Sequence, residues 1–149
     1  MIFLRDSIHY EHVLSRQCEF HYKDMGKNLE DFLAEIKKMG VHPGGPVFYA
    51  LNNVPQDENM KVEFFLPIKE ETVSVGEMKY HTYYSVENMM SIRVLEDFER
   101  KIEEAYAAML KLMEAENLQQ VTPPFHILDQ AGGQNFVTIK IGYMPKYME

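Results

Sequence analysis

The sequence predicts an α+β protein built from two copies of a strand-helix-strand-strand unit, and three observations support this. The 149 residues are 46% hydrophobic and 12% aromatic, which is enough for one domain with its own core. Adding 77 to the residue number carries PVFYAL, residues 46–51, onto PPFHIL, residues 123–128, and the same shift superimposes the apolar stripes of two helical segments. We therefore expect a single domain over residues 1–149, made of repeats at about residues 7–69 and 77–147.

The first repeat is expected to open with a strand over residues 8–20. The helix that follows should begin at the capping residue Asn28 and end at Gly40, with acidic residues in its first turn and lysines in its last, as the helix dipole favours. Strands over residues 47–52 and 61–68 then form a hairpin through the turn-forming segment NNVPQDEN.

The second repeat is expected to follow the same order. A strand over residues 78–84 precedes a linker, SVENMMS, at residues 85–91. A helix over residues 95–116 is predicted by apolar residues at alternating three- and four-residue spacing. Strands over residues 125–130 and 135–144 form a second hairpin through QAGGQN.

The offset between the repeats varies along the chain. The shift of 77 places Gly40 on Asn117, and both residue types favour helix C-termini. A shift of 78 aligns Pro67 with Pro145, and a shift of 70 aligns HYEHVL with KYHTYY. The seven-residue difference predicts about two more helical turns in the second repeat.

Composition narrows the classes of function. A net charge of −8, without any basic run, argues against binding to nucleic acid. The N-terminus fits neither a signal peptide nor a membrane span, and the single cysteine, Cys18, cannot form an internal disulfide, so we expect a cytoplasmic protein. The sequence holds no HExxH, CxxC, Walker A or GxSxG motif, so we expect no metal and no cofactor.

The duplicated unit, with PVFYAL and VEFFLPI in the first half and AYAAMLKLMEAEN, PPFHIL and IGYMP in the second, resembles the GyrI-like (gyrase-inhibitor-like) effector-binding family of bacteria. The resemblance implies a curved antiparallel sheet, two helices, and an aromatic small-molecule cleft at the pseudo-two-fold axis between the repeats. It also implies an acid shortly after a proline in the second-half hairpin, where this chain has His126. Because imidazole is not a fixed anion, the departure puts a preference for lipophilic cations in doubt.

Six residues are candidates for a ligand site: Tyr49, His126, Glu63, Phe65, Tyr83 and Tyr143. Tyr49 and His126 are repeat mates that face the cleft or, in the alternative, lie at the edge of the core. Glu63 is the one acid in an apolar strand and shares a strand face with Phe65, but a solvated position at the strand edge is the favoured alternative. Tyr143 aligns with Phe65.

The tyrosine-rich segment KYHTYY supplies Tyr83. Strict alternation would place Tyr80, Thr82 and Tyr84 on one strand face and His81 and Tyr83 on the other. Such tyrosines form either walls for a ligand or a stacked face of the core.

The function predicted from these residues is non-catalytic binding of a small aromatic or lipophilic molecule. One alternative is an interaction or inhibitor module that binds a protein partner. A weaker alternative is hydrolysis with Glu63 or His126 as the general base, although no nucleophile stands out and no catalytic residue is assigned.

Overall fold

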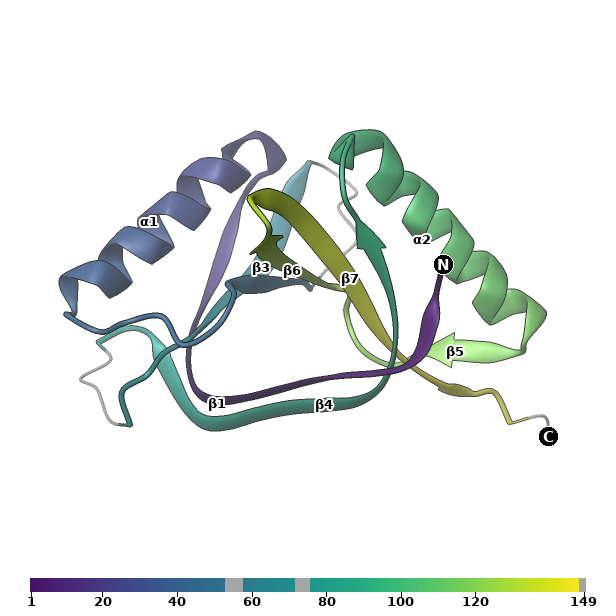
Figure 1. The fold of residues 1–149 in the computed structure, drawn as a ribbon, viewed down its shortest axis with the longest axis horizontal. Coiled ribbons are helices and arrows are strands. Elements are labelled where there is room, and N and C mark those ends of the chain that lie inside the picture. Colours follow the sequence, from purple (N-terminus) through teal and green to yellow (C-terminus); the bar gives the residue numbers. More distant parts are fainter. Residues whose placement is uncertain (53–57, 72–75, 148–149) are drawn as a thin grey trace. The chain divides into compact units, whose positions relative to one another are not determined.

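The computed structural model describes residues 1–52, 58–71 and 76–147, and its two helices and seven strands confirm the α+β class (Figure 1). Neither helix of this described part has the length and apolar character needed to cross a membrane. The elements are β1 (Phe3–His21), a short 3-10 helix (Tyr22–Asp24), α1 (Met25–Lys38), β2 (Phe48–Leu51), β3 (Asn59–Pro67), β4 (Lys79–Val94), α2 (Phe98–Ala115), β5 (Leu118–Gln120), β6 (Phe125–Ala131) and β7 (Gln134–Pro145).

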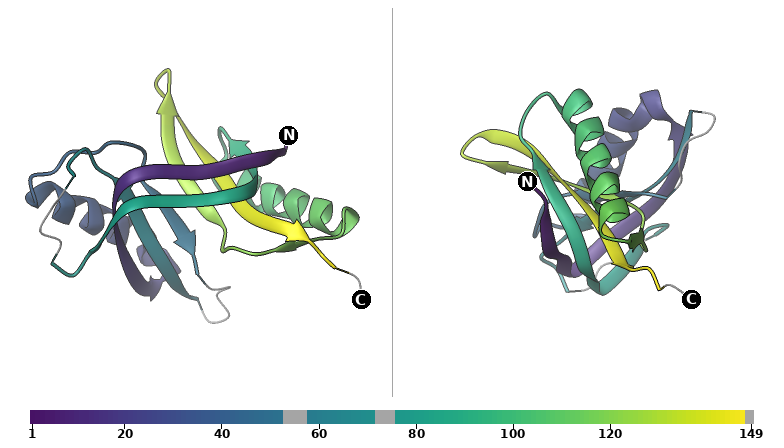
Figure 2. Two further views of the ribbon diagram at one scale, coloured as in Figure 1. Left: turned by 90° about the horizontal axis from the view of Figure 1, so that it is seen from below. Right: turned by 90° about the vertical axis from the view of Figure 1, so that its right-hand side faces the viewer.

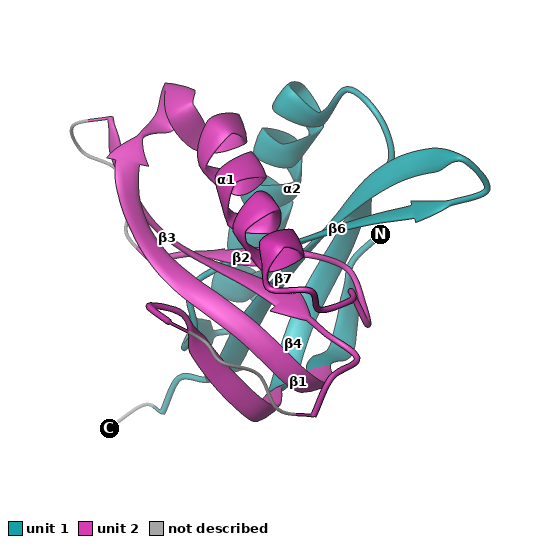
Figure 3. Cartoon of the chain, turned by 90° about the vertical axis from the view of Figure 1, so that its left-hand side faces the viewer, with its two compact units in different colours: residues 1–8, 86–149 teal, residues 9–85 magenta. Residues whose placement is uncertain are grey.

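The chain divides into two compact units, which Figure 3 colours separately. Unit 1 consists of residues 1–8 and 86–149, and unit 2 of residues 9–85. The long strands β1 and β4 each contribute residues to both units. The single-domain organisation and the repeat limits expected from the sequence stay predictions.

Unit 2 contains the first strand-helix-strand-strand repeat. Strand β3 pairs antiparallel with β1 on one side and with β2 on the other. Helix α1 covers one face of these strands, because the amphipathic helix buries Phe32 and Ile36 there. The core of this unit comprises Leu14, Phe32, Ile36, Val62, Phe64, Leu66, Ile68 and Met78.

Unit 1 repeats the arrangement around β7, which pairs antiparallel with β4, β6 and the short strand β5. Figure 2 shows the hairpin that joins β6 to β7. Helix α2 packs on one face of these strands and buries Ala105, Met109 and Met113. Strand β5, which the sequence did not predict, follows α2 directly.

Two details of the predicted elements are wrong. Helix α1 begins at Met25, so Asn28 lies inside the helix, where its Nδ2 donates to the carbonyl of Asp24 at 2.8 Å. The predicted linker at residues 85–91 belongs to β4, and its methionines at positions 89 and 90 are fully buried. Asn88 adopts a left-handed conformation (φ 56°) within β4, and the pairing of this strand with β7 begins at the next residue, Met89.

The helix ends confirm the expected pair of stop signals. Gly40 and Asn117 follow α1 and α2, and both adopt the left-handed conformation, with φ of 78° and 56°. The lengths are 14 residues for α1 and 18 for α2. The difference is therefore about one turn rather than the two predicted from the alignment.

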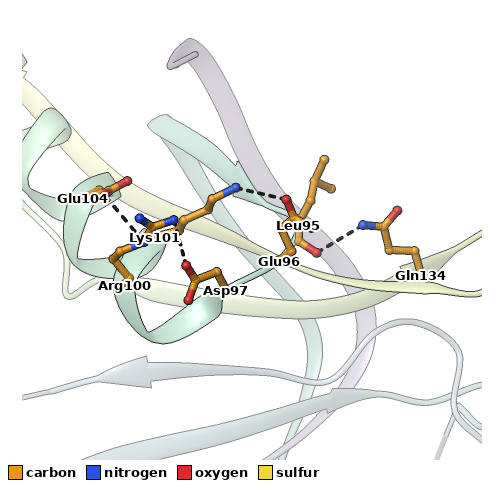
Figure 4. Close-up of polar contacts among 7 residues, drawn as sticks. All are labelled: Leu95, Glu96, Asp97, Arg100, Lys101, Glu104 and Gln134. Carbon is orange, nitrogen blue, oxygen red and sulfur yellow. Dashed lines mark hydrogen bonds and ion pairs between the residues drawn. The ribbon is translucent and has the colours of Figure 1, made fainter.

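Polar contacts fix the start of α2 (Figure 4). Arg100 lies 2.8 Å from the carboxylate of Asp97, and the Lys101 ammonium lies 3.5 Å from Glu96. Gln134, at the tip of the β6–β7 hairpin, donates to the carbonyl of Leu95 at 3.2 Å. The hairpin tip and the start of the helix are thus held together within unit 1.

The strand register corrects the alignment of the repeats. Phe65 is the Cα partner of Phe48, and Lys140 is the Cα partner of Phe125. Because Phe48 and Phe125 are repeat mates at a shift of 77, Lys140 is the counterpart of Phe65, at a shift of 75. The predicted shift of 78, which paired Phe65 with Tyr143, is wrong because β7 runs five residues beyond Lys140 to its final proline, whereas β3 runs two residues beyond Phe65.

Candidate ligand-binding site

The two faces of the strands in unit 2 differ in what covers them. Val62 and Phe64 of β3 belong to the core under α1. Since side chains alternate along a strand, Glu63 and Phe65 project from the opposite face. The register adds Phe48 of β2 to that opposite face, as the Cα partner of Phe65. The shared face of Glu63 and Phe65, predicted from the sequence, follows from this geometry.

An aromatic cluster covers this face, and we define it as Tyr10, Phe48, Phe65, His81 and Tyr84. The rings of Phe48 and Phe65 stack at 4.7 Å with an interplanar angle of 8°. Tyr84 lies 4.7 Å from Phe65, and its ring meets His81 edge-on at 5.5 Å and 73°. Tyr10 stacks on Phe48 at 5.6 Å. Such offset and edge-on arrangements are favourable for aromatic pairs.

The cluster has a buried floor and a partly exposed rim. Phe48 and Phe65 are 0% and 1% exposed, whereas His81 and Tyr84 are half-buried. Burial, together with the negative charge of Glu63, raises the pKa of Tyr84 to about 12. The phenol is therefore neutral at physiological pH, and Glu63 is the negative group that acts on this rim.

Tyr49 lies on the other face of β2, against the core under α1, where its ring meets Phe64 edge-on at 6.1 Å. Burial raises its pKa to about 12. This position matches the core-edge alternative considered for Tyr49. Its contact with a ligand stays a prediction, and its neighbours in unit 2 belong to the packing of the helix.

His126 occupies the equivalent place in unit 1. It is 4% exposed and is the Cα partner of Ile139, a core residue under α2. Its Nε2 lies 2.6 Å from the hydroxyl of Tyr106 on α2, and burial lowers its pKa to about 4. A neutral imidazole bonded to a helix tyrosine fits the core-edge alternative, so ligand binding by His126 also stays a prediction.

The remaining two candidates lie apart from the aromatic cluster. The Tyr83 hydroxyl lies 2.9 Å from Nδ1 of His9, and Tyr83 is 55% exposed. Tyr143 packs partly against the core of unit 1, and its hydroxyl donates to the carbonyl of Leu4. Of the six predicted residues, unit 2 brings together Glu63 and Phe65 on one face.

Sequence reasoning missed four members of the cluster, Tyr10, Phe48, His81 and Tyr84. Alternation in PVFYAL separates Phe48 from Tyr49, but it does not say which of the two faces the helix. His81 and Tyr84 were predicted on opposite strand faces, yet both rings contact Phe65. Strict alternation therefore fails between these two residues, and a single strand pattern carries no signal for that.

The described residues do not meet the requirements of a metal-binding site. They contain no group of three or more His, Cys, Asp or Glu side chains placed to hold a metal ion.

The fold is that of the GyrI-like proteins, as the sequence predicted. The chain matches the "EcmrR C-terminal domain" crystal structure with a TM-score of 0.72 and 12% identity, over 97% of this chain and 100% of that one. It matches EcmrR in the cryo-EM structure of its DNA complex with a TM-score of 0.74 and 13% identity, over 96% of this chain. This chain spans 59% of that EcmrR chain.

A third structure with this fold carries a ligand. It is SAV2435 bound to tetraphenylphosphonium, with a TM-score of 0.58 and 7% identity, over 95% of this chain and 94% of that one. No curated protein matches the chain in sequence. Residues 9–144 match the family described as Domain of unknown function (DUF5085), and the chain belongs to that family.

Proposed function

We propose that this protein binds small lipophilic molecules that carry an aromatic group and a positive charge, and that the aromatic cluster of unit 2 is the binding surface. The observation that carries the proposal is the half-buried rim of His81 and Tyr84 over the stacked rings of Phe48 and Phe65, with the negative charge of Glu63 acting on Tyr84. The GyrI-like fold, seen also in SAV2435 bound to tetraphenylphosphonium, supports the same class of ligand.

The chemistry of the surface suits such a ligand. Aromatic faces attract cations through their quadrupole, by about 0.5 to 2 kcal/mol depending on desolvation. Glu63 supplies a full opposite charge on the same face, and the half-buried rings of His81 and Tyr84 are accessible at its rim. In this proposal Glu63 replaces the acid that the family resemblance places at position 126.

The roles given to Tyr49, His126, Tyr83 and Tyr143 follow from where their side chains lie. Tyr49 packs against the core under α1 in unit 2, His126 is bonded to Tyr106 of α2 in unit 1, and Tyr83 and Tyr143 are not part of the aromatic cluster. These positions favour binding without chemical turnover, because the imidazole of His126, predicted as a general base, is buried and bonded to Tyr106.

The test is a ligand-dependent shift in thermal unfolding. Tetraphenylphosphonium at about 100 times its dissociation constant should stabilise the protein by about 2.7 kcal/mol. The neutral triphenylphosphine oxide should stabilise it much less, because it carries no net charge to meet Glu63.

Two variants and a matched control localise the effect. Glu63→Gln should weaken binding of the phosphonium about tenfold and leave binding of the neutral compound unchanged. Phe65→Leu should weaken binding of both compounds. Glu30→Gln removes the same charge from the exposed surface of α1 and should leave binding unchanged. The proposal fails if no lipophilic cation or neutral aromatic compound shifts unfolding, or if Glu63→Gln and Phe65→Leu bind like the parent.

A further inference from the structure

The two units share a buried serine at equivalent positions. Ser15 and Ser91 are 0% and 2% exposed, and each follows by three residues a residue with positive φ, His12 in β1 and Asn88 in β4. Ser15 is the Cα partner of Phe65, as Ser91 is of Lys140. The shift of 76 that relates the serines replaces the shift of 70 predicted for these strands.

Each serine hydroxyl holds a titratable side chain, and the two side chains differ. In unit 1, Ser91 hydrogen-bonds the Asp6 carboxylate, which in turn lies 3.2 Å from the Lys140 ammonium. In unit 2, the Ser15 hydroxyl lies 2.8 Å from Nε2 of His81. The place filled by a fixed ion pair in one unit is therefore filled in the other by an imidazole beside Phe65.

We propose that His81, positioned by Ser15, determines the specificity of the aromatic cluster by changing charge with pH. The neutral imidazole admits a lipophilic cation, and the protonated imidazole rejects it. The inference rests on the proposed function, because it concerns the regulation of the same surface.

The serine can hold both forms of the imidazole. A hydroxyl donates one hydrogen bond and accepts others, so Ser15 donates to a neutral Nε2 and accepts from a protonated one. The ring stays in place while its charge changes. Histidine is the side chain whose ordinary titration falls between pH 5 and 8.

A cation on the cluster would meet the charge of His81 directly. The His81 ring lies 6.3 Å from Phe65 and 5.5 Å from Tyr84, so a ligand on these rings would be within about 7 Å of the imidazole. At that separation two positive charges near a protein surface weaken binding by about tenfold or more.

The other titratable groups on this face are few in the part of the chain that the structure describes. Strand β3 contributes Glu63 and Lys61, β1 contributes Tyr10 and Glu19, and β4 contributes Tyr84. Glu19 and Lys61 are Cα partners of one another at the far end of the face. Strand β2 contributes no charge, since Phe48 and Ala50 are its residues there.

The experiment measures the dissociation constant of tetraphenylphosphonium by calorimetry at pH 8.0 and pH 5.5, a range above that in which carboxylates ordinarily protonate. The wild-type protein should bind about tenfold more weakly at pH 5.5. His81→Gln should bind equally at both values, while His42→Gln, which alters an exposed histidine elsewhere in unit 2, should keep the tenfold change. Triphenylphosphine oxide should show no dependence on pH.

The variant Ser15→Ala tests whether the serine acts by positioning His81. It should move the midpoint of the pH profile of phosphonium binding, and the variant protein should still bind the phosphonium at pH 8.0. Binding that is independent of pH, or a pH dependence that persists in His81→Gln, would overturn this inference and leave the proposed function intact. Absence of phosphonium binding at either pH would overturn both.

Discussion

Phe65 and Lys140 occupy equivalent positions in the two units. Each lies on the central strand of its unit, between a buried serine on one neighbouring strand and a phenylalanine on the other. These neighbours are Ser15 and Phe48 for Phe65, and Ser91 and Phe125 for Lys140. The same backbone site thus carries an aromatic floor in unit 2 and a charged group in unit 1, so the duplicated fold presents two chemically different faces.

The Lys140 site makes a first prediction about stability. The Lys140 side chain is 17% exposed, and its ammonium lies 3.2 Å from Asp6 and 2.6 Å from the carbonyl of Ser7. Asp6→Asn should lower the free energy of unfolding by about 2 kcal/mol, because it leaves a largely buried cation without its counter-charge. Urea unfolding at pH 7 measures the change.

The control for this prediction is Asp129→Asn, an exposed position in the same unit where the loss should stay within about 0.5 kcal/mol. The double variant Asp6→Asn, Lys140→Met should recover part of the loss, because it removes the unpaired charge as well. Equal effects of Asp6→Asn and Asp129→Asn would contradict the role of the ion pair.

His126 predicts how stability depends on pH. Its pKa is lowered by burial to about 4 in the folded chain, against 6.5 for an ordinary histidine. Between these values the unfolded chain binds a proton that the folded chain does not, so the free energy of unfolding rises with pH. The contribution is full above pH 6.5, and about 3 kcal/mol of it is lost as the pH falls to 4.

The measurement is urea unfolding of the wild-type protein and of His126→Gln at half-unit steps from pH 4 to pH 8. The variant should be less stable at pH 7, since it replaces the ring that meets Tyr106, but its curve should lack the steep slope between pH 4 and 6.5. His42→Gln serves as the matched control, and its curve should retain the steep slope of the parent between pH 4 and 6.5. Parallel curves for His126→Gln and the parent would refute this assignment.

The sequence predicted the repeated unit and both helices because those features depend on local pattern. The apolar stripes and the left-handed stop residues Gly40 and Asn117 are local in this sense. The continuation of β4 through Asn88 could not be predicted in this way. A polar segment with a left-handed residue has the same appearance in a linker and in a strand, and only the pairing with β7 distinguishes them.

The same distinction between local pattern and long-range strand pairing applies to the candidate site. Alternation placed Glu63 and Phe65 on one face correctly, because that relationship lies within a single strand. It could not say which face of β2 meets the helix, so Tyr49 was chosen although Phe48 belongs to the cluster. The partners of Phe65 come from strand register, which is a long-range property.

The third prediction concerns the space around Gly142 in β7, which is too small for a larger side chain. A methyl group added at this position would lie 2.5 Å from Cγ2 of Thr122, whose hydroxyl accepts a 2.8 Å hydrogen bond from the Gly142 amide. Gly142→Ala should therefore cost about 1 to 3 kcal/mol through overpacking. Combining it with Thr122→Ser, which removes Cγ2, should recover part of that loss in chemical unfolding.

Gly26 offers a matched control for this change. It lies in α1 with no atom within 4 Å of an added methyl group, so Gly26→Ala should leave stability unchanged or raise it slightly. A Gly142→Ala variant as stable as Gly26→Ala would show that β7 moves away from Thr122 without cost.

The ends of the two helices make the last prediction, since both chain positions adopt φ above 50° but carry different residues. The left-handed conformation has a steric cost for Asn117 that glycine would not have, so Asn117→Gly should raise the free energy of unfolding by about 0.5 to 1 kcal/mol.

At Gly40 an added methyl group meets no atom within 4 Å, so the loss of about 1 kcal/mol expected for Gly40→Ala arises from the backbone alone. Gly40→Asn should cost less than Gly40→Ala, because asparagine tolerates the left-handed region. Thermal unfolding of the three variants should rank Asn117→Gly above the parent, and the parent above Gly40→Asn and Gly40→Ala in that order. The reverse order of the two Gly40 variants would show that the end of α1 relaxes out of the left-handed conformation when its glycine is replaced.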